Sequence, residues 1–410
     1  MKNFRPIKNC RISGKNDLVR ILDLGIHPLA NSLKSIQTDI KEKFPLSISF
    51  SEESSLVQLN ETVDKETLFN HYVWVTGTAK ATKRYSNIFF ENLITNTSLK
   101  KNDFVVEIAS NDGTFLKPFL QKGYNNIQGI DPAINIAKIA NNNGVPTIPK
   151  YWSSQLAKKI KTQKGLAKVV FARNVIPHVS ELLDVIEGIQ IILSESGTGI
   201  IEFHYLGNIL EGLQYDSIYH EHLCYFSINS ITYLLNRFNL FPYHIENSPI
   251  SGGARSIYFG KTIRNKSTQL KSQIKLENNL KINELSTWKN FAKKVESHKA
   301  KTIEILDNLK GKKILGFGSS ARSQTYLNYC NIDTEQICAI VDNNSLKQGK
   351  FAPGSSIPIV SMKDGLSMNP DIIFILAWNF QDEIIASCKR AGCKAEFLIP
   401  FPLEPFFYQK

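Results

Sequence analysis

The stretch 104–131 constrains the fold of this chain more than any other, because it reads as a strand, a tight turn, a helix and a second strand. The apolar run 104–108 leads into a small polar turn that ends at Gly113, and apolar residues then recur at helical spacing. A second apolar run, 127–130, places Asp131 at the end of the next strand. This order predicts a doubly wound α/β unit, with Asp131 where such folds place the acid that holds a ribose.

The turn lacks the G-x-G-x-x-G fingerprint, so a bound dinucleotide is not favoured. Its residues, E-x-x-S-N-D-G followed by G-x-D-P, resemble motifs I and II of the class I S-adenosylmethionine-dependent methyltransferases. The resemblance implies S-adenosylmethionine as the cofactor, with Gly113 allowing close backbone approach and Asp131 accepting both ribose hydroxyls. The cofactor-binding residues that it implies are Glu107, Ala109, Ser110, Asn111, Asp112, Gly113, Asp131, Pro132 and, further along, Asn174. An ordinary βαβ turn with an acidic strand end is the alternative.

Length and composition indicate a globular protein of several domains. A chain of 410 residues exceeds the usual size of a single core, and 42% apolar with 21% charged residues is typical of soluble proteins. No apolar run reaches the roughly 18 residues that span a bilayer, and the N-terminus lacks the apolar region of a signal peptide. Six scattered cysteines predict reduced thiols rather than disulfides. We therefore expect a cytoplasmic protein without a membrane partner.

The formal charge of +12 could indicate nucleic-acid binding. Much of the excess lies in the lysine-rich segments 158–168 and 261–313, which are more typical of solvated helix faces. The charge still favours an anionic substrate. A small molecule that carries a diphosphate satisfies it without a polynucleotide, so we expect no nucleic-acid partner.

The first segment, 1–85, has the layout of a small zinc ribbon whose ligands come in two separated pairs. It is similar to the N-terminal domain of the sugar C-methyltransferases, which act on nucleotide-linked 4-keto-6-deoxy sugars and carry C-R-x-C and C-x-x-C around an L-D-L-G-x-x-P-L-A-N motif. Here only Cys10 is a cysteine, and Ser13, Ser51 and Ser54 stand in the other three positions. Serine is a poor zinc ligand, so we predict no metal. Packing must then come from apolar residues such as Leu22, Leu24, Leu29, Leu33, Ile48, Phe50, Leu56 and Val57.

Three further segments follow. Strands and helices alternate over 86–258, which predicts a central methyltransferase domain with a mostly parallel sheet, and 259–311 reads as an amphipathic helical connector in which Trp288 and Phe291 argue for burial. Over 312–410 the pattern begins again as strand, glycine turn and helix. Its K-Q-G-x-x-x-P-G and A-W-N-F-x-x-E-I motifs resemble the C-terminal Rossmann-like domain of the same methyltransferases. The predicted fold class is α/β.

The segment 214–226, QYDSIYHEHLCYF, holds the densest cluster of titratable side chains. Satisfied core histidines are one interpretation. A metal site through His220 and His222, which share a face of an extended chain, is a second, although no further ligands are evident. The third is proton abstraction beside a carbonyl, which needs a neutral base, an orienting acid and a hydroxyl donor toward the enolate. The cluster supplies all three.

Y-H-E-H-x-x-Y-F-S, carried by residues 219–227, is the most specific motif shared with the sugar C-methyltransferases. The resemblance implies that His222 is the catalytic base and that the other catalytic residues are Tyr219, Glu221, Tyr72, His178 and Asn174. Tyr72 can also be read as a half-buried core aromatic. The substrate-binding residues that the resemblance implies are His220, Arg255, Gly318, Ser319, Arg322, Asn328, Lys347 and Asn379. The family's H-G-G-S-L-R loop is altered to S-G-G-A-R-S at 251–256, where the histidine is lost.

Together these features predict an S-adenosylmethionine-dependent C-methyltransferase of a nucleotide-linked 4-keto deoxyhexose, active in deoxysugar biosynthesis. One alternative is C- or O-methylation of another small anionic metabolite, which the altered loop keeps open. A second is a catalytically decayed binding protein, although the cofactor motifs and the 219–222 cluster are intact. The nucleotide base, the carbon and face methylated, and the oligomeric state do not follow from the sequence.

Overall fold

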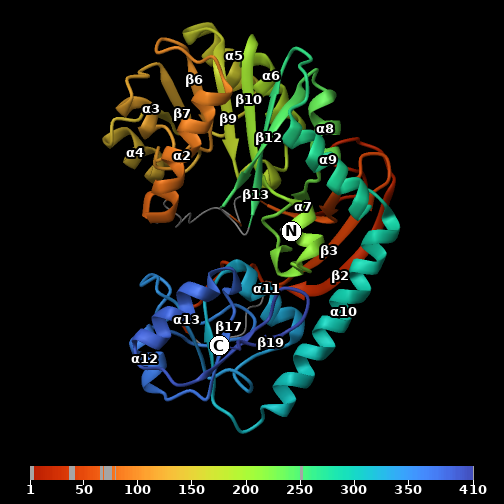
Figure 1. Cartoon of the computed structure of the whole chain (residues 1–410), viewed down its shortest axis with the longest axis vertical. Coiled ribbons are helices and arrows are strands. Elements are labelled where there is room, and N and C mark those ends of the chain that lie inside the picture. The colour runs from red at the N-terminus through yellow and green to blue at the C-terminus, as the bar shows by residue number, and fades with distance from the viewer. Residues whose placement is uncertain are drawn as a thin grey trace.

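In the computed structural model the described residues are 4–36, 42–64, 68, 76–78, 80–249 and 253–409. Two α/β units lie at opposite ends of the molecule, and a smaller antiparallel sheet lies between them along one side (Figure 1). A long helix, α10 (Leu285–Asn308), runs past this sheet from one unit toward the other. The predicted α/β class with two Rossmann-like units and a small N-terminal sheet is confirmed.

The central unit is built on a seven-stranded sheet with the order β12-β13-β10-β9-β6-β7-β8. Strands β10, β9, β6, β7 and β8 are parallel, whereas β13 and β12 are antiparallel to their neighbours. The strands are β6 (Val105–Ile108), β7 (Ile127–Ile130), β8 (Thr147–Ile148), β9 (Ala167–Arg173), β10 (Leu193–His204), β12 (Phe241–Ser248) and β13 (Ala254–Gly260). The predicted first and second strands are thus β6 and β7, and they pair in parallel register.

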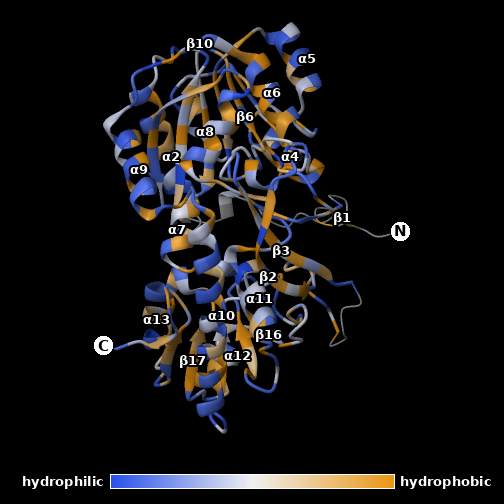
Figure 2. Cartoon of the chain, turned by 90° about the vertical axis from the view of Figure 1, so that its right-hand side faces the viewer, coloured by the Kyte–Doolittle hydropathy of each residue, from blue (hydrophilic) through white to orange (hydrophobic). Residues whose placement is uncertain are grey.

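Alternate residues of these strands face two separate helical layers. On one face, Val105 and Phe171 pack with α2 (Lys80–Asn96) and α3 (Lys117–Gln121). On the other face, Val106 and Val170 pack with α5 (Ser154–Lys164) and α6 (Leu182–Ile192). Because both faces are covered, these strands carry buried apolar residues on both faces, as a doubly wound sheet requires, with Glu107 of β6 and Glu202 of β10 as buried polar exceptions. Figure 2 shows the apolar colour following these strands.

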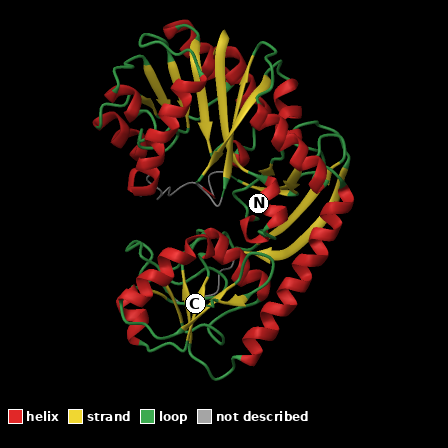
Figure 3. Ribbon diagram, in the orientation of Figure 1, coloured by secondary structure: helices red, strands yellow, loops and turns green. Residues whose placement is uncertain are grey.

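The remaining helices of the central unit connect its strands and lead toward the second unit. They are α4 (Ile134–Asn142), α7 (Leu206–Glu211), α8 (Ile228–Asn236) and α9 (Thr268–Leu280), with the short 3-10 helices η1 (Thr76–Thr78), η2 (Ile176–His178) and η3 (Tyr215–Ser217). Figure 3 shows helices on both sides of the sheets in the two α/β units.

The N-terminal part forms a four-stranded antiparallel sheet with the order β11-β4-β3-β2. Three strands come from this part: β2 (Leu18–His27), β3 (Phe44–Ser51) and β4 (Val57–Leu59), while β1 (Phe4–Pro6) pairs separately with β5 (Glu61–Val63). The fourth strand, β11 (Cys224–Tyr225), comes from the central unit and begins two residues after His222. The loop that carries His222 is therefore joined to the N-terminal sheet by backbone pairing.

Hydrogen bonds connect three of the four positions at which the resemblance implied zinc ligands. The Ser54 hydroxyl lies 3.2 Å from the Cys10 thiol and donates to the Ser51 hydroxyl at 2.9 Å. The Ser51 hydroxyl donates in turn to Asp17 at 2.8 Å. Within the described ranges, no group of three or more histidine, cysteine, aspartate or glutamate side chains is placed to hold a metal ion. Six of the eight apolar residues expected to pack this part are buried, and Leu29 and Leu33 are partly buried.

The second α/β unit has the strand order β16-β15-β14-β17-β18-β19, parallel except for β19. Its strands are β14 (Ile314–Phe317), β15 (Ala339–Val341), β16 (Ile359–Val360), β17 (Ile372–Ile375), β18 (Glu396–Ile399) and β19 (Phe406–Phe407), and its helices are α11 (Ala321–Cys330), α12 (Met362–Ser367), η4 (Trp378–Phe380) and α13 (Gln381–Arg390). Trp288 and Phe291 of α10 are buried, as predicted for the connector. No helix among the described residues is both long and apolar enough to cross a membrane.

Candidate active site

The turn after β6 is shaped around Asp131. The Asp131 carboxylate is 5% exposed, and its oxygens each accept one backbone hydrogen bond, from Asn111 N at 2.9 Å and from Ala133 N at 3.0 Å. Ala109 and Asn111 have φ angles of 54° and 50°, so the turn is wound in the left-handed region. Each carboxylate oxygen keeps a lone pair for a further donor, which suits the two hydroxyls of a ribose.

Two glycines of the motifs are required by close packing. A Cβ on Gly113, whose φ is 78°, would lie 2.7 Å from the Val145 side chain. A Cβ on Gly129 would lie 2.5 Å from the Ser110 hydroxyl oxygen. Gly113 was expected to let the backbone approach a cofactor. In the structure its immediate constraint is the side chain of Val145.

Two buried polar atoms at the end of β6 and in this turn have no hydrogen-bond partner in the described part of the chain: Glu107 Oε2 and the Ser110 hydroxyl. Burial raises the pKa of Glu107 well above its ordinary value, and the Arg173 guanidinium opposes that shift. Buried polar atoms are rarely left without partners, so these two indicate a place for a polar ligand. Together with Asp131 they fit a nucleoside with hydroxyl and amino donors, as S-adenosylmethionine is.

Asn174 follows β9 and is hydrogen-bonded to Glu202 of the neighbouring strand β10. It has a φ of 48°, and its side-chain amide donates to Glu202 Oε1 at 2.8 Å while its backbone N donates to Glu202 O at 2.8 Å. Glu202 is fully buried and also accepts from Tyr85 at 2.7 Å and Arg173 at 2.8 Å. The amide orientation of Asn174 is thereby set by Glu202.

His222 is held in one tautomer. Its Nδ1–H donates to the Ser217 carbonyl at 2.8 Å, because a carbonyl oxygen can only accept. Nε2 therefore carries a lone pair, and the Tyr219 hydroxyl donates to it at 2.6 Å. Burial and the neighbouring His178 and His204 lower the pKa of His222 well below its ordinary value, so the ring is neutral near pH 7. A neutral imidazole whose lone pair is held only by a phenol hydroxyl can take a proton from a substrate once that hydroxyl turns away.

Two more histidines surround this ring. His178, at the end of η2, lies edge-on to His222 with ring centroids 4.8 Å apart, and burial lowers its pKa to about 4. His204, at the end of β10, has its ring centroid 6.5 Å from that of His222, and its Nε2 has no partner among the described residues. The sequence analysis missed His204. Its position two residues after Glu202 on the same strand was the available signal, since such residues share a face.

Glu221 and His220 point away from the base. Glu221 accepts from the Asn31 side chain at 2.6 Å, and burial raises its pKa. His220 is 3% exposed, and its Nε2 lies 3.1 Å from the Pro45 carbonyl. Both side chains thus tie the loop to the N-terminal part, and the group that orients His222 is the Ser217 carbonyl. His220 and His222 do not converge on one point, which removes the geometric basis for a shared metal ion.

The expected substrate residues lie mainly around the second unit. Arg322 donates to Asp216 through Nε at 3.0 Å and Nη2 at 2.8 Å. Asn328 donates to two backbone carbonyls of its own unit, and Arg255 lies over the Tyr205 ring at 4.7 Å. Two expected residues line a pocket at the carboxyl ends of β14 and β15, whose lining includes Gly318, Ser319, Ser320, Asp342 and Arg390.

Lys347 lies at the edge of this part of the second unit. Its ammonium donates to Ser319 O at 2.6 Å and to Asp342 at 3.3 Å. Asn379 lies on η4 and is exposed. Tyr72, the remaining candidate, falls outside the described residues.

Comparison with known proteins shows similarity to C-methyltransferases over almost the whole chain. Family models described as "Putative zinc binding domain", "Methyltransferase domain" and "C-methyltransferase C-terminal domain" match residues 10–69, 82–244 and 249–402. The C-methyltransferase NovU of Streptomyces niveus is 30% identical over 405 residues, which cover 97% of this chain and 96% of NovU.

Two solved structures each resemble less than half of the chain. The PH0226 protein of Pyrococcus horikoshii OT3 is 16% identical with a TM-score of 0.38, covering 48% of this chain and 99% of that one. Magnesium protoporphyrin IX methyltransferase of Synechocystis PCC 6803, with bound S-adenosylmethionine, is 12% identical with a TM-score of 0.34, covering 44% and 79%. These TM-scores are too low to bear on the activity of this chain.

Proposed function

Because the chain belongs to the S-adenosylmethionine-dependent C-methyltransferase family, we propose that it methylates the carbon beside the ketone of a nucleotide-linked 4-keto deoxyhexose. The observation that carries this finer proposal is the state of His222. Its Nδ1–H is bound by the Ser217 carbonyl, so its Nε2 is a neutral base that faces the Tyr219 hydroxyl. C-methylation needs a carbanion, and a base paired with a hydroxyl donor is what generates one beside a ketone.

The reaction proceeds in two steps. The ketone makes the neighbouring C–H acidic, and His222 Nε2 takes that proton while the electron pair moves into the carbonyl oxygen. The Tyr219 hydroxyl turns from Nε2 to the enolate oxygen and stabilises its charge. When bound, S-adenosylmethionine would supply an electrophilic methyl group on its sulfonium, and the substrate carbon would form its new C–C bond to that methyl as the C–S bond breaks. His222 then releases its proton to solvent.

The cofactor would be held by the turn after β6. Asp131 would accept the ribose hydroxyls, and Glu107, Ser110, Asn111 and Asn174 would take the remaining polar groups. The pairing of Asn174 with Glu202 holds its side chain at the end of β9, and β9 neighbours β6 in the sheet. The ring centroids of His178, beyond β9, and of His204, at the end of β10, lie 4.8 and 6.5 Å from that of His222. Methyl donor and base would then meet at the same edge of the sheet, which would supply the alignment that methyl transfer requires.

The low pKa of His222 has a consequence for the substrate. Burial and neighbouring histidines keep the ring neutral, but they also make it a weak base. An anionic substrate bound beside it favours the protonated ring and so raises its basicity when the substrate is present. A diphosphate-linked sugar has this property, and the net charge of +12 favours its approach.

The nucleotide part would bind in the pocket of the second unit. Gly318 and Ser319 form the turn after β14, and Asp342 follows β15, the position at which doubly wound folds contact a ribose. Lys347, Asn379 and Arg255 remain candidates for substrate contacts. Arg322 is paired with the buried Asp216, and the Asn328 amide donates to two backbone carbonyls, so both are assigned to holding the protein structure rather than to substrate contact. A cytoplasmic location belongs to this proposal, and all six cysteines are unpaired in the structure.

The test is a mass screen of the purified enzyme with S-adenosylmethionine and a panel of nucleotide-linked keto sugars. We expect one methyl group on carbon for a 4-keto sugar and none for its 4-hydroxy counterpart, because only the ketone acidifies the neighbouring hydrogen. Methylation of the 4-hydroxy sugar on oxygen would overturn the enolate mechanism. Binding of the cofactor without turnover on any sugar would favour a decayed binding protein.

A further inference from the structure

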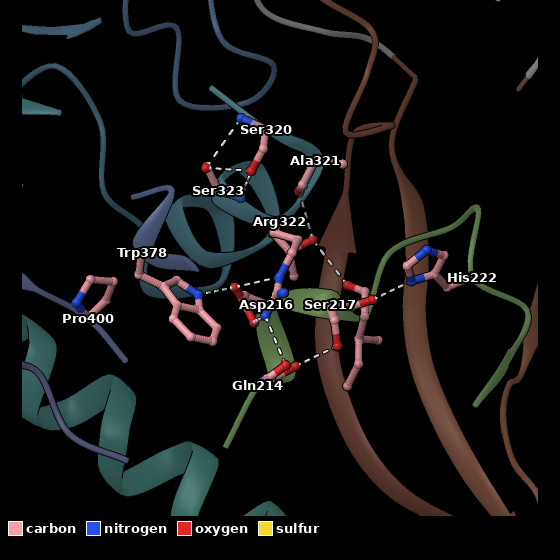
Figure 4. A network of polar contacts seen from close by, with 12 residues as sticks. Gln214, Asp216, Ser217, His222, Ser320, Ala321, Arg322, Ser323, Trp378 and Pro400 are labelled. Carbon is pink, nitrogen blue, oxygen red and sulfur yellow. Dashed lines mark hydrogen bonds and ion pairs between the residues drawn. The ribbon is translucent and has the colours of Figure 1, made fainter. Parts of the chain in front are cut away.

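Each of the three consecutive residues of the short helix η3 contacts a different part of the protein: helix α10, helix α11 and the loop that carries His222. The Tyr215 hydroxyl lies 2.9 Å from His298 Nδ1 on α10, Asp216 is paired with Arg322 of α11, and the Ser217 carbonyl accepts from His222. All three residues of η3 are buried. Figure 4 shows the contacts of Asp216 and Ser217, with Arg322 and Trp378 of the second unit on one side and His222 on the other.

The contact with the second unit is specific in geometry. The Asp216 side chain is 1% exposed and accepts two hydrogen bonds from the Arg322 guanidinium, and Trp378 Nε1 donates a third at 2.9 Å. The guanidinium also lies 4.9 Å from the centre of the Trp378 ring. One residue beyond η3, the Ile218 carbonyl accepts from Thr325 of α11 at 3.1 Å. The second unit therefore contacts the residues on both sides of Ser217, whose carbonyl orients the base.

A buried carboxylate depends on such partners, since it is costly to leave one unpaired. If the second unit moved away, Asp216 would lose all three donors, and η3 would have to rearrange toward water. The Ser217 carbonyl would move with it, and His222 would lose the acceptor that sets its tautomer. The second unit is also where the nucleotide part of the substrate is proposed to bind.

We propose that Arg322 and Asp216 are positioning residues that couple docking of the second unit to the orientation of His222, so that the base is set only when the unit is in place. Arg322, expected from the sequence to bind the substrate directly, acts through the base instead. The catalytic consequence rests on the proposed role of His222. The coupling itself can be measured without substrate.

The test compares Arg322→Met and Asp216→Asn with a matched control, Lys301→Met. Lys301 pairs with Glu404 and so also joins α10 to the second unit, but this pair is exposed and does not contact η3. Nuclear magnetic resonance of ring-labelled histidine reports the His222 Nδ1–H. In both test variants we expect this proton to exchange with solvent and its ring to populate the other tautomer, while the control resembles wild type.

With the methylated sugar as readout, kcat should fall about 100-fold in both test variants, as for a misplaced catalytic group, with KM for S-adenosylmethionine unchanged. An unchanged His222 signal in Arg322→Met would overturn the proposal, as would an equal loss in Lys301→Met. If Arg322→Met also loses cofactor binding, the decision passes to Asp216→Asn, which keeps the shape of the side chain. If no sugar is methylated, the proposed function fails but the proton signal still decides the coupling.

Discussion

Replacing Asp131 with asparagine changes one carboxylate oxygen to an amide nitrogen and so tests whether Asp131 binds the cofactor's ribose. Both carboxylate oxygens accept a backbone N–H, and each retains one lone pair for a ribose hydroxyl. In Asp131→Asn one oxygen becomes an amide NH₂, which faces an N–H donor and cannot accept from a hydroxyl. One charge-assisted hydrogen bond is lost, at a cost of about 2 kcal/mol. The Kd for S-adenosylmethionine should therefore rise about 30-fold.

Calorimetric titration with S-adenosylmethionine measures this change directly. Asp103→Asn provides the matched control, because Asp103 caps a turn before the opposite end of β6 through one backbone hydrogen bond. Burial raises the pKa of Asp131, and the protonated carboxyl has fewer acceptor sites. Wild-type affinity should accordingly weaken as pH falls through that pKa, and Asp131→Asn should lose this dependence. An affinity within about twofold of wild type in Asp131→Asn would refute the assignment.

Three further outcomes are expected. Metal analysis of wild-type protein should find no stoichiometric zinc, and finding about one zinc per chain would contradict this. A variant that combines Ser13→Cys, Ser51→Cys and Ser54→Cys should bind zinc, which should raise its melting temperature. Burial lowers the pKa of His220 from 6.5 to about 4, so protonation of the unfolded chain should reduce the free energy of unfolding by roughly 3 kcal/mol as pH falls from 6.5 to 4. His220→Gln should therefore make stability less dependent on pH in this range, and an unchanged pH dependence would argue against the burial of a neutral ring. Tyr219→Phe should lower kcat about 100-fold without weakening cofactor binding, and near-normal turnover would remove the hydroxyl from the mechanism.

The parts of this structure that follow from local sequence were predictable. The alternation of apolar strands with helical segments identifies the doubly wound sheet. The turn before Asp131 predicts the edge of that sheet at which the cofactor would bind. Trp288 and Phe291 indicate that the connector is buried. These features depend on neighbours within a few residues, so periodicity and turn composition reveal them.

Long-range contacts were not predictable in the same way. Arg322 reads as a free charge for an anion, but its partner Asp216 is 106 residues away in the chain. Glu221 reads as the acid that orients the base, yet the structure pairs it with Asn31. The orienting group, the Ser217 carbonyl, is a backbone atom, and residue type carries no signal for it. Strand β11 likewise joins a sheet formed by a distant segment.

The central claim is that His222 removes a proton from the carbon beside the ketone. The most direct measurement is deuterium exchange at that carbon in a nucleotide-linked 4-keto sugar, followed in heavy water with S-adenosylhomocysteine in place of the methyl donor. We predict that wild type and His244→Asn, a histidine replacement on β12, catalyse the exchange, and that His222→Asn does not, because an amide cannot accept the proton at neutral pH. Exchange at the wild-type rate in His222→Asn would contradict the account.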